Sequence, residues 1–215
     1  MTDSGDKIKK RYNRIASLYD TIEYMMEKGK MGDWREALWK RVNAFLSEDS
    51  GEGNHRLLEA GVGTGKNIAY YPEDIDISAI DFSEKMLAKA RKKAEECNRD
   101  IDLLKMNIED LRFPDNHFDL IVTSCVFCSV PNPVNGFREL KRVCKDNGRI
   151  IMLEHMRTRR EPWGKLMDAF NWISLYTWGA NINRETMKNI RKADLKVVEE
   201  KDLWFDIVKE LVLKP

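Results

Sequence analysis

Short apolar runs and helix-like segments alternate along the middle of this 215-residue chain, and this alternation constrains the fold more than any other feature. The apolar runs predict strands, and the segments between them repeat their apolar residues at helical spacing. Strands that alternate with helices form βαβ units, so the pattern predicts an α/β protein whose parallel sheet is covered on both faces. The predicted strands are RLLEA from 56, DIDISAI before 81, IDLLKM from 101, HFDLIVTS from 117 and NGRIIMLEH from 147.

The two ends of the chain depart from this alternation. From about Gly5 to Ser47 the pattern is helical, and Asp33 followed by Glu36 is typical of a capping box. This helix carries an apolar stripe at Trp34, Leu38, Val42, Phe45 and Leu46. In the tail, one residue separates the strand-like runs LKVVEEKDLWF and IVKELVL, which predicts a hairpin and an antiparallel edge to the sheet.

Three helices are expected between the predicted strands. One follows the glycine cluster after residue 60, a second follows Ser83, which is expected to cap it, and a third precedes the fifth strand. The turn at Asn147-Gly148 is expected to open that strand. The apolar faces are Met86, Leu87, Ala90, Ala94 and Cys97 in the second helix, and Val134, Phe137, Leu140 and Cys144 in the third.

Composition and charge exclude several classes of protein. The 37 basic and 36 acidic residues give a net charge of +1, which argues against a dedicated nucleic-acid-binding protein. The longest uncharged run, 120–137, contains Pro131 and Pro133 and is excluded as a membrane span, and the N-terminal sequence lacks the apolar core of a secretory signal. Four cysteines without a dense framework indicate a reducing compartment. We therefore expect a cytoplasmic protein.

The first strand runs directly into glycines at alternate positions, in the sequence EAGVGTG over 59–65. Glycine allows a tight turn and lets a ligand approach backbone amides closely. The Walker phosphate loop is excluded because Gly65-Lys66 is followed by Asn67 instead of Ser or Thr. The dinucleotide fingerprint requires a third glycine where Lys66 stands, which disfavours a nicotinamide oxidoreductase.

The pattern E-x-G-x-G-x-G after a first strand resembles the cofactor loop of class I S-adenosylmethionine-dependent methyltransferases. Asp81 closes the second strand about twenty residues after the glycines, where an acid can accept hydrogen bonds from both ribose hydroxyls. The resemblance implies a Rossmann-like sheet of seven strands, S-adenosylmethionine as cofactor and an enzyme that transfers its methyl group. It implies cofactor contacts by Glu59, Gly61, Gly63, Thr64, Gly65, Asp81 and Phe82.

Two further segments extend the resemblance over roughly 12–155. NIEDLRFPD from 107, followed by HFDL, is similar to the family segment D-A-E-x-L-P-F-x-D-x-S-F-D, whose first two residues meet the adenine. The Asn that replaces Asp can still accept a hydrogen bond from the adenine amino group. Y-x-x-x-A-x-x-Y-D from 12 is similar to the N-terminal helix of quinone C-methyltransferases and bacterial phospholipid N-methyltransferases, which folds over the cofactor. The implied contacts are Tyr12, Tyr19, Asn107, Ile108, Ser124 and Cys125.

The C-terminal half is similar to a different branch of the family. VFCSV from 126, LEH from 153 and NRET from 183 resemble the membrane-associated thiol S-methyltransferases of animals. The acceptor is therefore expected to be a small, lipophilic molecule, with a thiol favoured and a quinone or an aminophospholipid as alternatives. His155 is the candidate general base because it ends the fifth strand beside the ligand crevice, unless it only hydrogen-bonds a nearby loop. The competing function is a module that binds the cofactor without turnover.

Three remaining features each allow two interpretations. Cys125 and Cys128 fit the wall of a pocket better than a metal centre, because a zinc site needs four ligands and no second such pair exists, so no metal is expected. The aromatic segment 163–178 is either core packing or a lid over the acceptor. The basic clusters at 7–14 and 157–160 form a solvated face or, alternatively, hold anionic lipid headgroups at a membrane surface.

The expected organisation is one methyltransferase domain over 1–215. Its parts are a helical cap at 1–48, the cofactor-binding core at 49–155, a helical insertion on the acceptor side at 156–193 and the edge hairpin at 194–215.

Overall fold

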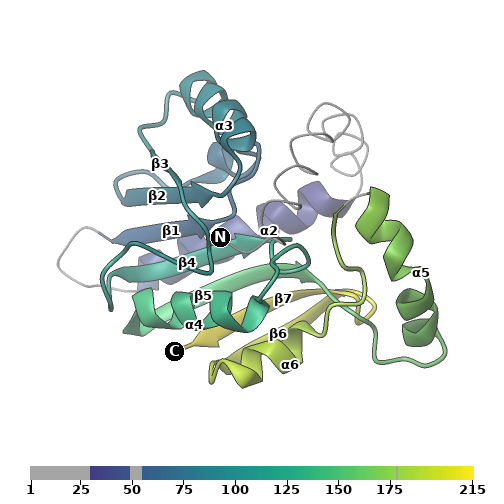
Figure 1. The fold of residues 1–215 in the computed structure, drawn as a ribbon. Helices are drawn as coiled ribbons and strands as arrows, with labels where there is room; N and C mark the ends of the chain where they lie inside the picture. Colours follow the sequence, from purple (N-terminus) through teal and green to yellow (C-terminus); the bar gives the residue numbers. More distant parts are fainter. Residues whose placement is uncertain (1–29, 49–54, 178) are drawn as a thin grey trace.

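The computed structural model describes residues 30–48, 55–177 and 179–215, which form one seven-stranded sheet with helices on both faces (Figure 1). The strand order is β3-β2-β1-β4-β5-β7-β6. The predicted α/β class and seven strands are therefore confirmed. The strands span Arg56–Ala60 (β1), Asp76–Asp81 (β2), Asp102–Lys105 (β3), Phe118–Ser124 (β4), Cys144–His155 (β5), Lys196–Trp204 (β6) and Val208–Lys214 (β7).

The first five strands are parallel, and the last two form the predicted antiparallel edge. The hairpin folds back so that β7, not β6, pairs with β5, and its register places Val208 opposite His155. The chain order reverses between β1 and β4, so the carboxyl ends of β1 to β5 lie along one edge with a topological switch point in the middle. In open α/β sheets, ligands bind at this point.

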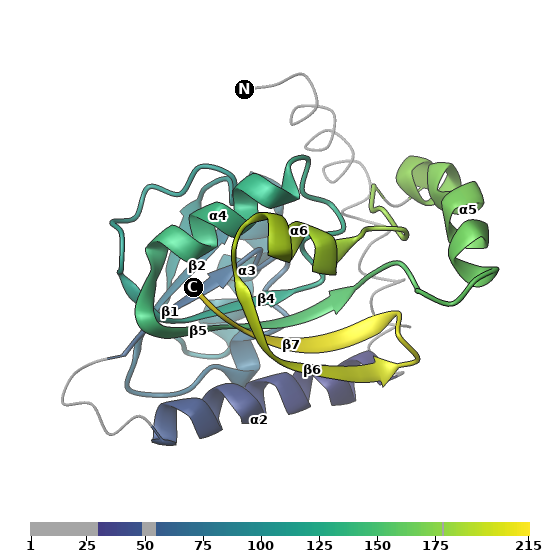
Figure 2. The same cartoon turned by 90° about the horizontal axis from the view of Figure 1, so that it is seen from below.

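The helices form a layer on each face of the sheet, and one helix stands apart (Figure 2). On one face lie α2 (Gly32–Glu48) and α3 (Glu84–Glu96), and on the other lie α4 (Pro133–Val143) and α6 (Thr186–Lys192). The remaining helix, α5 (Trp163–Thr177), stands beside the sheet in both views (Figures 1 and 2). The parallel sheet is thus covered on both faces, as its continuous apolar strands require.

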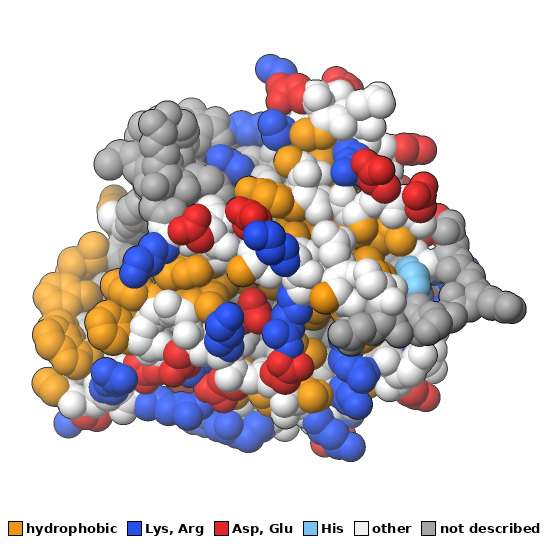
Figure 3. Space-filling model, turned by 180° about the vertical axis from the view of Figure 1, so that it is seen from behind, with side chains coloured by type: hydrophobic (Ala, Val, Ile, Leu, Met, Phe, Trp, Pro, Cys, Tyr) orange, Lys and Arg blue, Asp and Glu red, His pale blue; other side chains and the backbone are white. Residues whose placement is uncertain are grey.

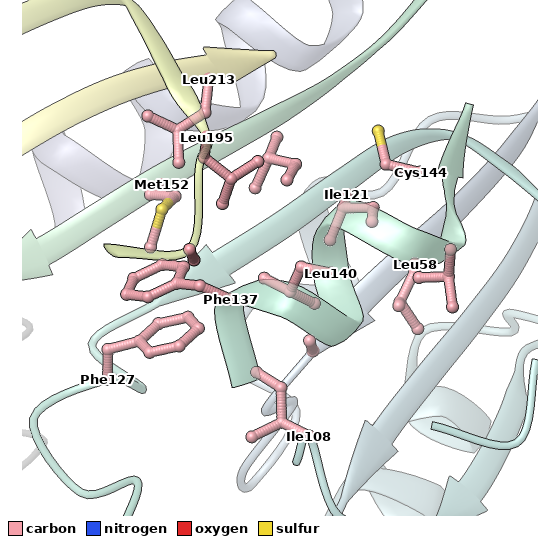
Figure 4. Close-up of a cluster of buried hydrophobic side chains, with 14 of the residues drawn as sticks. Leu58, Ile108, Ile121, Phe127, Phe137, Leu140, Cys144, Met152, Leu195 and Leu213 are labelled. Atoms are coloured by element: carbon pink, nitrogen blue, oxygen red, sulfur yellow. The ribbon is translucent and has the colours of Figure 1, made fainter. Parts of the chain in front are cut away.

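Each face of the sheet buries its own apolar cluster. On the α4 face, Phe127 and Phe137 stack with ring centroids 3.7 Å apart and planes 3° apart (Figure 4). On the α2 face, the predicted stripe is confirmed at Leu38 and Val42, which are fully buried. Trp39 is buried beside them, although the predicted stripe did not include it.

The start of α3 confirms its predicted cap. The Ser83 side chain accepts a hydrogen bond from the backbone N–H of Met86, 3.4 Å away, which satisfies one donor of the first turn. Four residues of the predicted face are buried and Cys97, the C-cap, is half-buried. This cap holds the segment that follows β2, where the site lies.

Two predicted helix boundaries were wrong. The helix expected after the glycine loop is a single 3₁₀ turn, Ile68–Tyr70 (η2). It ends there because Pro72 lacks an N–H group and drives Tyr71 into an extended conformation, with φ −60° and ψ 137°. At the other boundary, α2 begins at Gly32, so Asp33 lies in the first turn of the helix instead of capping it.

The start of the fifth strand also differs from the prediction. Cys144, expected on the face of the preceding helix, is the first residue of β5 and pairs with Phe118. The register then shifts, and regular pairing resumes between Leu120 and Arg149. Asn147-Gly148 therefore lies inside the strand, within this irregularity, and does not open it. Pairing with β4 extends the strand backwards beyond what the local sequence signals.

Candidate active site

The carboxyl ends of β1, β2, β4 and β5 meet at one edge, and backbone hydrogen bonds join the loops that leave them. The N–H groups of Gly61 and Val62 both donate to the Ile80 carbonyl, each over 2.9 Å. Cys125, after β4, donates its backbone N–H to the Leu153 carbonyl of β5 over 2.8 Å. This edge brings together most of the residues predicted from the sequence, namely Glu59, Gly61, Gly63, Thr64, Gly65, Asp81, Phe82, Ser124, Cys125 and His155.

The glycine loop adopts a backbone that other residues rarely adopt. Gly61, Gly63 and Gly65 have φ values of 89°, 56° and 85°. A Cβ at Gly61 would lie 2.4 Å from Cγ2 of Val126, so this position also lacks space for a side chain. A Cβ at Gly63 would meet nothing within 4 Å among the described residues, so the loop presents bare backbone to open space there. The positive φ values and the lack of space for a side chain at Gly61 explain why glycine stands at these positions.

Asp81 connects the end of β2 to the glycine loop. Its Oδ2 accepts a hydrogen bond from the Gly63 N–H over 3.1 Å, and its Oδ1 accepts one from the Ser83 N–H over 2.8 Å. Burial raises the pKa of its carboxyl group to about 6, although these backbone donors act in the opposite direction. Each carboxylate oxygen has a second lone pair, so Asp81 retains capacity for further donors.

A buried network that the sequence did not predict surrounds Glu59. Asn67 and Tyr71 both donate side-chain hydrogen bonds to its carboxylate, and Arg35 of α2 donates to Asn67 over 2.5 Å. Burial raises the pKa of Glu59 to about 7, and the negative charge of Asp81 contributes to the same shift. The network therefore ties the helix that precedes β1 to the glycine loop. Its sequence signal is a lone acid in an otherwise apolar strand, which must find partners when buried.

The segment after β3 lies at the same edge but on its outer side. Asn107 is exposed, and its side-chain oxygen accepts a hydrogen bond from the Glu109 N–H over 3.1 Å. Ile108 is buried in the apolar cluster on the α4 face. Arg142 of α4 holds the rest of this segment, because it donates to the carbonyls of Leu111 and Phe113. The side chain of Ile108, the second residue predicted to meet the adenine, therefore packs in the core.

A second unpredicted acid organises the loop after β4. Glu154 is fully buried, and it accepts hydrogen bonds from the Thr123 hydroxyl and the Val126 N–H, each over 3.1 Å. Burial raises its pKa to about 7. Cys125 in this loop has a φ of 56°, and burial, followed by the charge of Glu154, strongly raises the pKa of its thiol. Both cysteines of the pair carry such raised pKa values, so they are protonated and apolar at neutral pH.

His155 ends β5 at this edge. It is half-buried, and burial lowers the pKa of its imidazole below the ordinary value of 6.5, so the ring is neutral at pH 7. His117 instead precedes β4 at the opposite edge of the sheet, where it stacks near Phe113. Because the strands are parallel, His155 at the end of β5 lies at the candidate site, and His117 before β4 lies away from it.

Arg184 closes the far side of the loop after β4, and the predictions did not include it as a site residue. It lies between α5 and α6, and its Nη2 donates to the carbonyl of Val130 over 2.9 Å and to that of Cys128 over 3.3 Å. Its Nε is buried without a hydrogen-bond partner within the described part of the chain. The Asn181 side chain donates to the same Cys128 carbonyl over 3.0 Å. These contacts fix the 179–184 segment against the candidate site.

Comparison with known proteins places this geometry in a family. A family model described as a methyltransferase domain matches residues 58–152. The chain is 32% identical over 159 residues to phosphatidylethanolamine N-methyltransferase of Cereibacter sphaeroides, which covers 73% of this chain and 72% of that protein. The chain belongs to the class I S-adenosylmethionine-dependent methyltransferases.

Other relatives of this methyltransferase are named for different activities. It is 28% identical to the ubiquinone/menaquinone biosynthesis C-methyltransferase UbiE of Proteus mirabilis, over 77% of this chain and 65% of that one. It is 30% identical to the mouse thiol S-methyltransferase TMT1B, over 68% of this chain and 62% of that one. The chain thus spans just under two thirds of these two relatives. A SAM-dependent methyltransferase structure from Aquifex aeolicus shares the fold, with a TM-score of 0.59 at 19% identity over 79% of this chain and 87% of that one.

The cofactor of the methyltransferase is S-adenosylmethionine, and the residues at the edge fit it. The cofactor supplies a methyl group on a positively charged sulfonium. Bare backbone at Gly63 leaves room for close approach, and Asp81 is an acceptor suited to a ribose diol.

The predicted basic cluster at 7–14 and residues 1–29 of the predicted cap at 1–48 lie outside the described residues. Tyr12, Tyr19 and Trp178 lie outside the described residues. The alternative that 163–178 is core packing is wrong for most of the described part, because six large apolar side chains of α5 are exposed, whereas Met167 and Leu175 are half-buried. The lid over the acceptor stays a prediction. Within the described ranges, every helix is too short or too polar to traverse a bilayer.

Proposed function

We propose that this methyltransferase transfers a methyl group from S-adenosylmethionine to a small, lipophilic acceptor, and that a thiol is favoured over a quinone or an aminophospholipid. The observation that carries the proposal is the position of His155 at the carboxyl end of β5, half-buried and neutral at pH 7. A neutral imidazole can accept the proton that an acceptor loses. A thiol, with an ordinary pKa of about 8.5, needs only this modest assistance.

The proposed cofactor contacts follow from the same edge. The ribose hydroxyls donate to Asp81, and the backbone of the glycine loop with Thr64 receives the methionine part. Asn107 and the backbone of Ile108 meet the adenine, while the remaining contacts come from Glu59, Phe82, Ser124 and Cys125. Tyr12 and Tyr19 cover the bound cofactor from the N-terminal cap, residues 1–48. The backbone hydrogen bonds that Asp81 accepts from Gly63, Ser83 and Phe82 support its role, because they hold its carboxylate in one orientation.

The state of the buried acids supports a neutral acceptor. An aminophospholipid brings a positive headgroup, which is stabilised by a carboxylate that is available for pairing. At the ends of β1, β2 and β5, however, Glu59, Asp81 and Glu154 accept hydrogen bonds from the protein itself. The protonated thiol of Cys125 adds a soft, apolar group near His155, and Cys128 follows it in the same loop. These features suit a thiol or another lipophilic molecule.

The relatives support all three acceptor classes, so the acceptor must be decided by assay. The decisive experiment offers labelled S-adenosylmethionine with a model thiol, a quinone and an aminophospholipid in separate reactions. We expect methylation of the thiol, and a turnover lowered about 10²–10⁴-fold at neutral pH in a His155→Ala variant. The deficit should shrink as the pH rises through the thiol pKa, because the thiol then ionises by itself.

His117→Ala is the matched control, since it removes a histidine at the opposite edge of the sheet and should keep wild-type turnover. Transfer to the quinone or the aminophospholipid without any thiol methylation would replace the proposed acceptor. No transfer to any acceptor, with binding of S-adenosylhomocysteine intact in calorimetry, would favour the alternative of a binding module without turnover.

A further inference from the structure

The helix α5 is amphipathic in the opposite sense to the other helices. Polar side chains on one side of it contact the rest of the protein: Asp168 pairs with Arg157 over 2.9 Å, and Asn171 donates to Asn181 over 3.1 Å. Gly164, on the same inner side, is buried against the Arg157 guanidinium. The exposed side chains are instead large and apolar, namely Trp163, Leu166, Phe170, Trp172, Ile173 and Tyr176.

This outward face is held rigidly by its polar contacts. The Ile182 N–H donates to the Asn171 side chain over 3.0 Å, and the Ser174 hydroxyl donates to the Ala180 carbonyl over 2.9 Å. Rotating the helix to bury its aromatic side chains would break these bonds and the pair between Asp168 and Arg157. The exposure of Trp172 (68%) and Tyr176 (70%) is therefore built into the fold, and an exposed apolar area of this kind marks an interaction surface.

The turn between β6 and β7 adds two more aromatic side chains on the same side of the molecule. Trp204 and Phe205 are exposed, and Phe205 has a φ of 47°, which is rare for a bulky residue. Asp206 ties this turn to the segment before α5, because it accepts hydrogen bonds from the Thr158 hydroxyl and the Arg159 N–H. Both ribbon views place the turn on the α5 side of the sheet (Figures 1 and 2), and Figure 3 shows apolar side chains gathered at that end.

Basic side chains flank this apolar surface. Between 157 and 177 the chain has four basic and two acidic residues; Arg157 pairs with both acids, Glu161 and Asp168, and Arg159 pairs with Glu200 of β6. Arg160 lies over the Phe205 ring, 5.8 Å from its centroid, and Lys165 is exposed on α5 itself. Tryptophan and tyrosine with lysine and arginine around an apolar face are the composition of helices that lie in the plane of a membrane interface.

We propose that the outward face of α5, together with Trp204 and Phe205, docks the protein onto the surface of an anionic lipid bilayer. The aromatic side chains enter the boundary between headgroups and acyl chains, and the surrounding basic residues contact the anionic headgroups. The exposed tryptophan and tyrosine side chains, with Arg160 and Lys165 beside them, favour a lipid interface over a second copy of the chain. This surface is independent of the acceptor and of turnover.

The test is sedimentation with vesicles of phosphatidylcholine, with and without phosphatidylglycerol, at low ionic strength. We expect wild-type protein to bind the anionic vesicles, with a blue shift of tryptophan emission, and to bind much less to neutral ones. The double variant F170S/W172S should lose at least about tenfold in vesicle affinity, since it removes two exposed aromatic rings that would enter the bilayer. R160Q/K165Q should lose affinity for anionic vesicles only.

The matched control is Val198→Ser, which removes an exposed apolar side chain from the opposite end of β6 and should bind vesicles like wild type. Unchanged affinity for S-adenosylhomocysteine would show that each variant is folded. Equal vesicle binding by wild type and F170S/W172S would overturn the proposal. A second outcome would also overturn it: wild type forms a dimer in light scattering, F170S/W172S is monomeric, and neither protein binds vesicles. The face would then be a contact between two copies of the chain.

Discussion

The charge on Asp81 should control cofactor affinity between about pH 5 and pH 7. Its carboxyl group is buried, and its pKa is raised to about 6. If the carboxylate accepts the ribose hydroxyls, only the ionised form binds well, so lowering the pH through 6 must protonate it first. For one such group, the dissociation constant should rise about tenfold between pH 7 and pH 5 and remain flat above pH 7.

Replacing Asp81 by Asn removes both the titration and one acceptor oxygen. The amide group has a single oxygen, and it places a donor near either the Gly63 N–H or the Ser83 N–H, where the carboxylate now accepts over 3.1 and 2.8 Å. The loss of one charge-assisted hydrogen bond to the ribose costs about 1.5–3 kcal/mol, or roughly ten- to a hundredfold in affinity at neutral pH. The affinity of this variant should no longer depend on pH in this range.

Isothermal titration calorimetry with S-adenosylhomocysteine at a series of pH values measures both effects. Asp102→Asn, which changes an exposed acid at the opposite end of β3, is the matched control and should behave as wild type. Glu59 also has a raised pKa, so a Glu59→Gln variant shows how much of the pH dependence belongs to its network. An Asp81→Asn variant that kept the wild-type pH profile and affinity would refute the assignment of Asp81 to the ribose.

Two further predictions concern the scaffold of the site. Gly61→Ala should lower the free energy of unfolding by about 2–5 kcal/mol, because the new side chain has an unfavourable φ and clashes with Val126. Adding Val126→Ala should restore only the part of the stability that is lost to the clash, and urea denaturation measures both changes. The pKa of Glu154 is about 7 in the folded state, against an ordinary value of 4.5, so ionisation of Glu154 opposes folding. The stabilisation that the protonated side chain gives the folded state is complete below pH 4.5 and is lost as the pH rises through 7. The thermal midpoint of wild type relative to Glu154→Gln should therefore fall between pH 5 and pH 8, and a constant difference would contradict this.

Local sequence was sufficient for the order of the strands and for the conformation of the glycine loop. Strand and helix periodicities differ, so alternation of the two predicted the α/β sheet. The loop could be identified because the local backbone requires glycine at these positions: their φ values are positive, and a side chain at Gly61 has no space. The position of Asp81 beside the glycine loop was also predictable from local sequence, because Asp81 ends the next strand about twenty residues after the glycines.

Tertiary contacts decided what no local pattern encodes. β5 begins at Cys144 because β4 offers it a partner strand. Burial in the folded protein raises the pKa values of Glu59 and Glu154, although hydrogen bonds from residues 12 and 28 positions away act in the opposite direction. The direction in which α5 faces is the clearest case. Its aromatic residues predict a buried or covering helix, yet bonds from Arg157 and Asn181 hold its polar side inward. Hydrophobic periodicity defines the faces of a helix, whereas the partners supplied by the rest of the fold determine which face meets solvent.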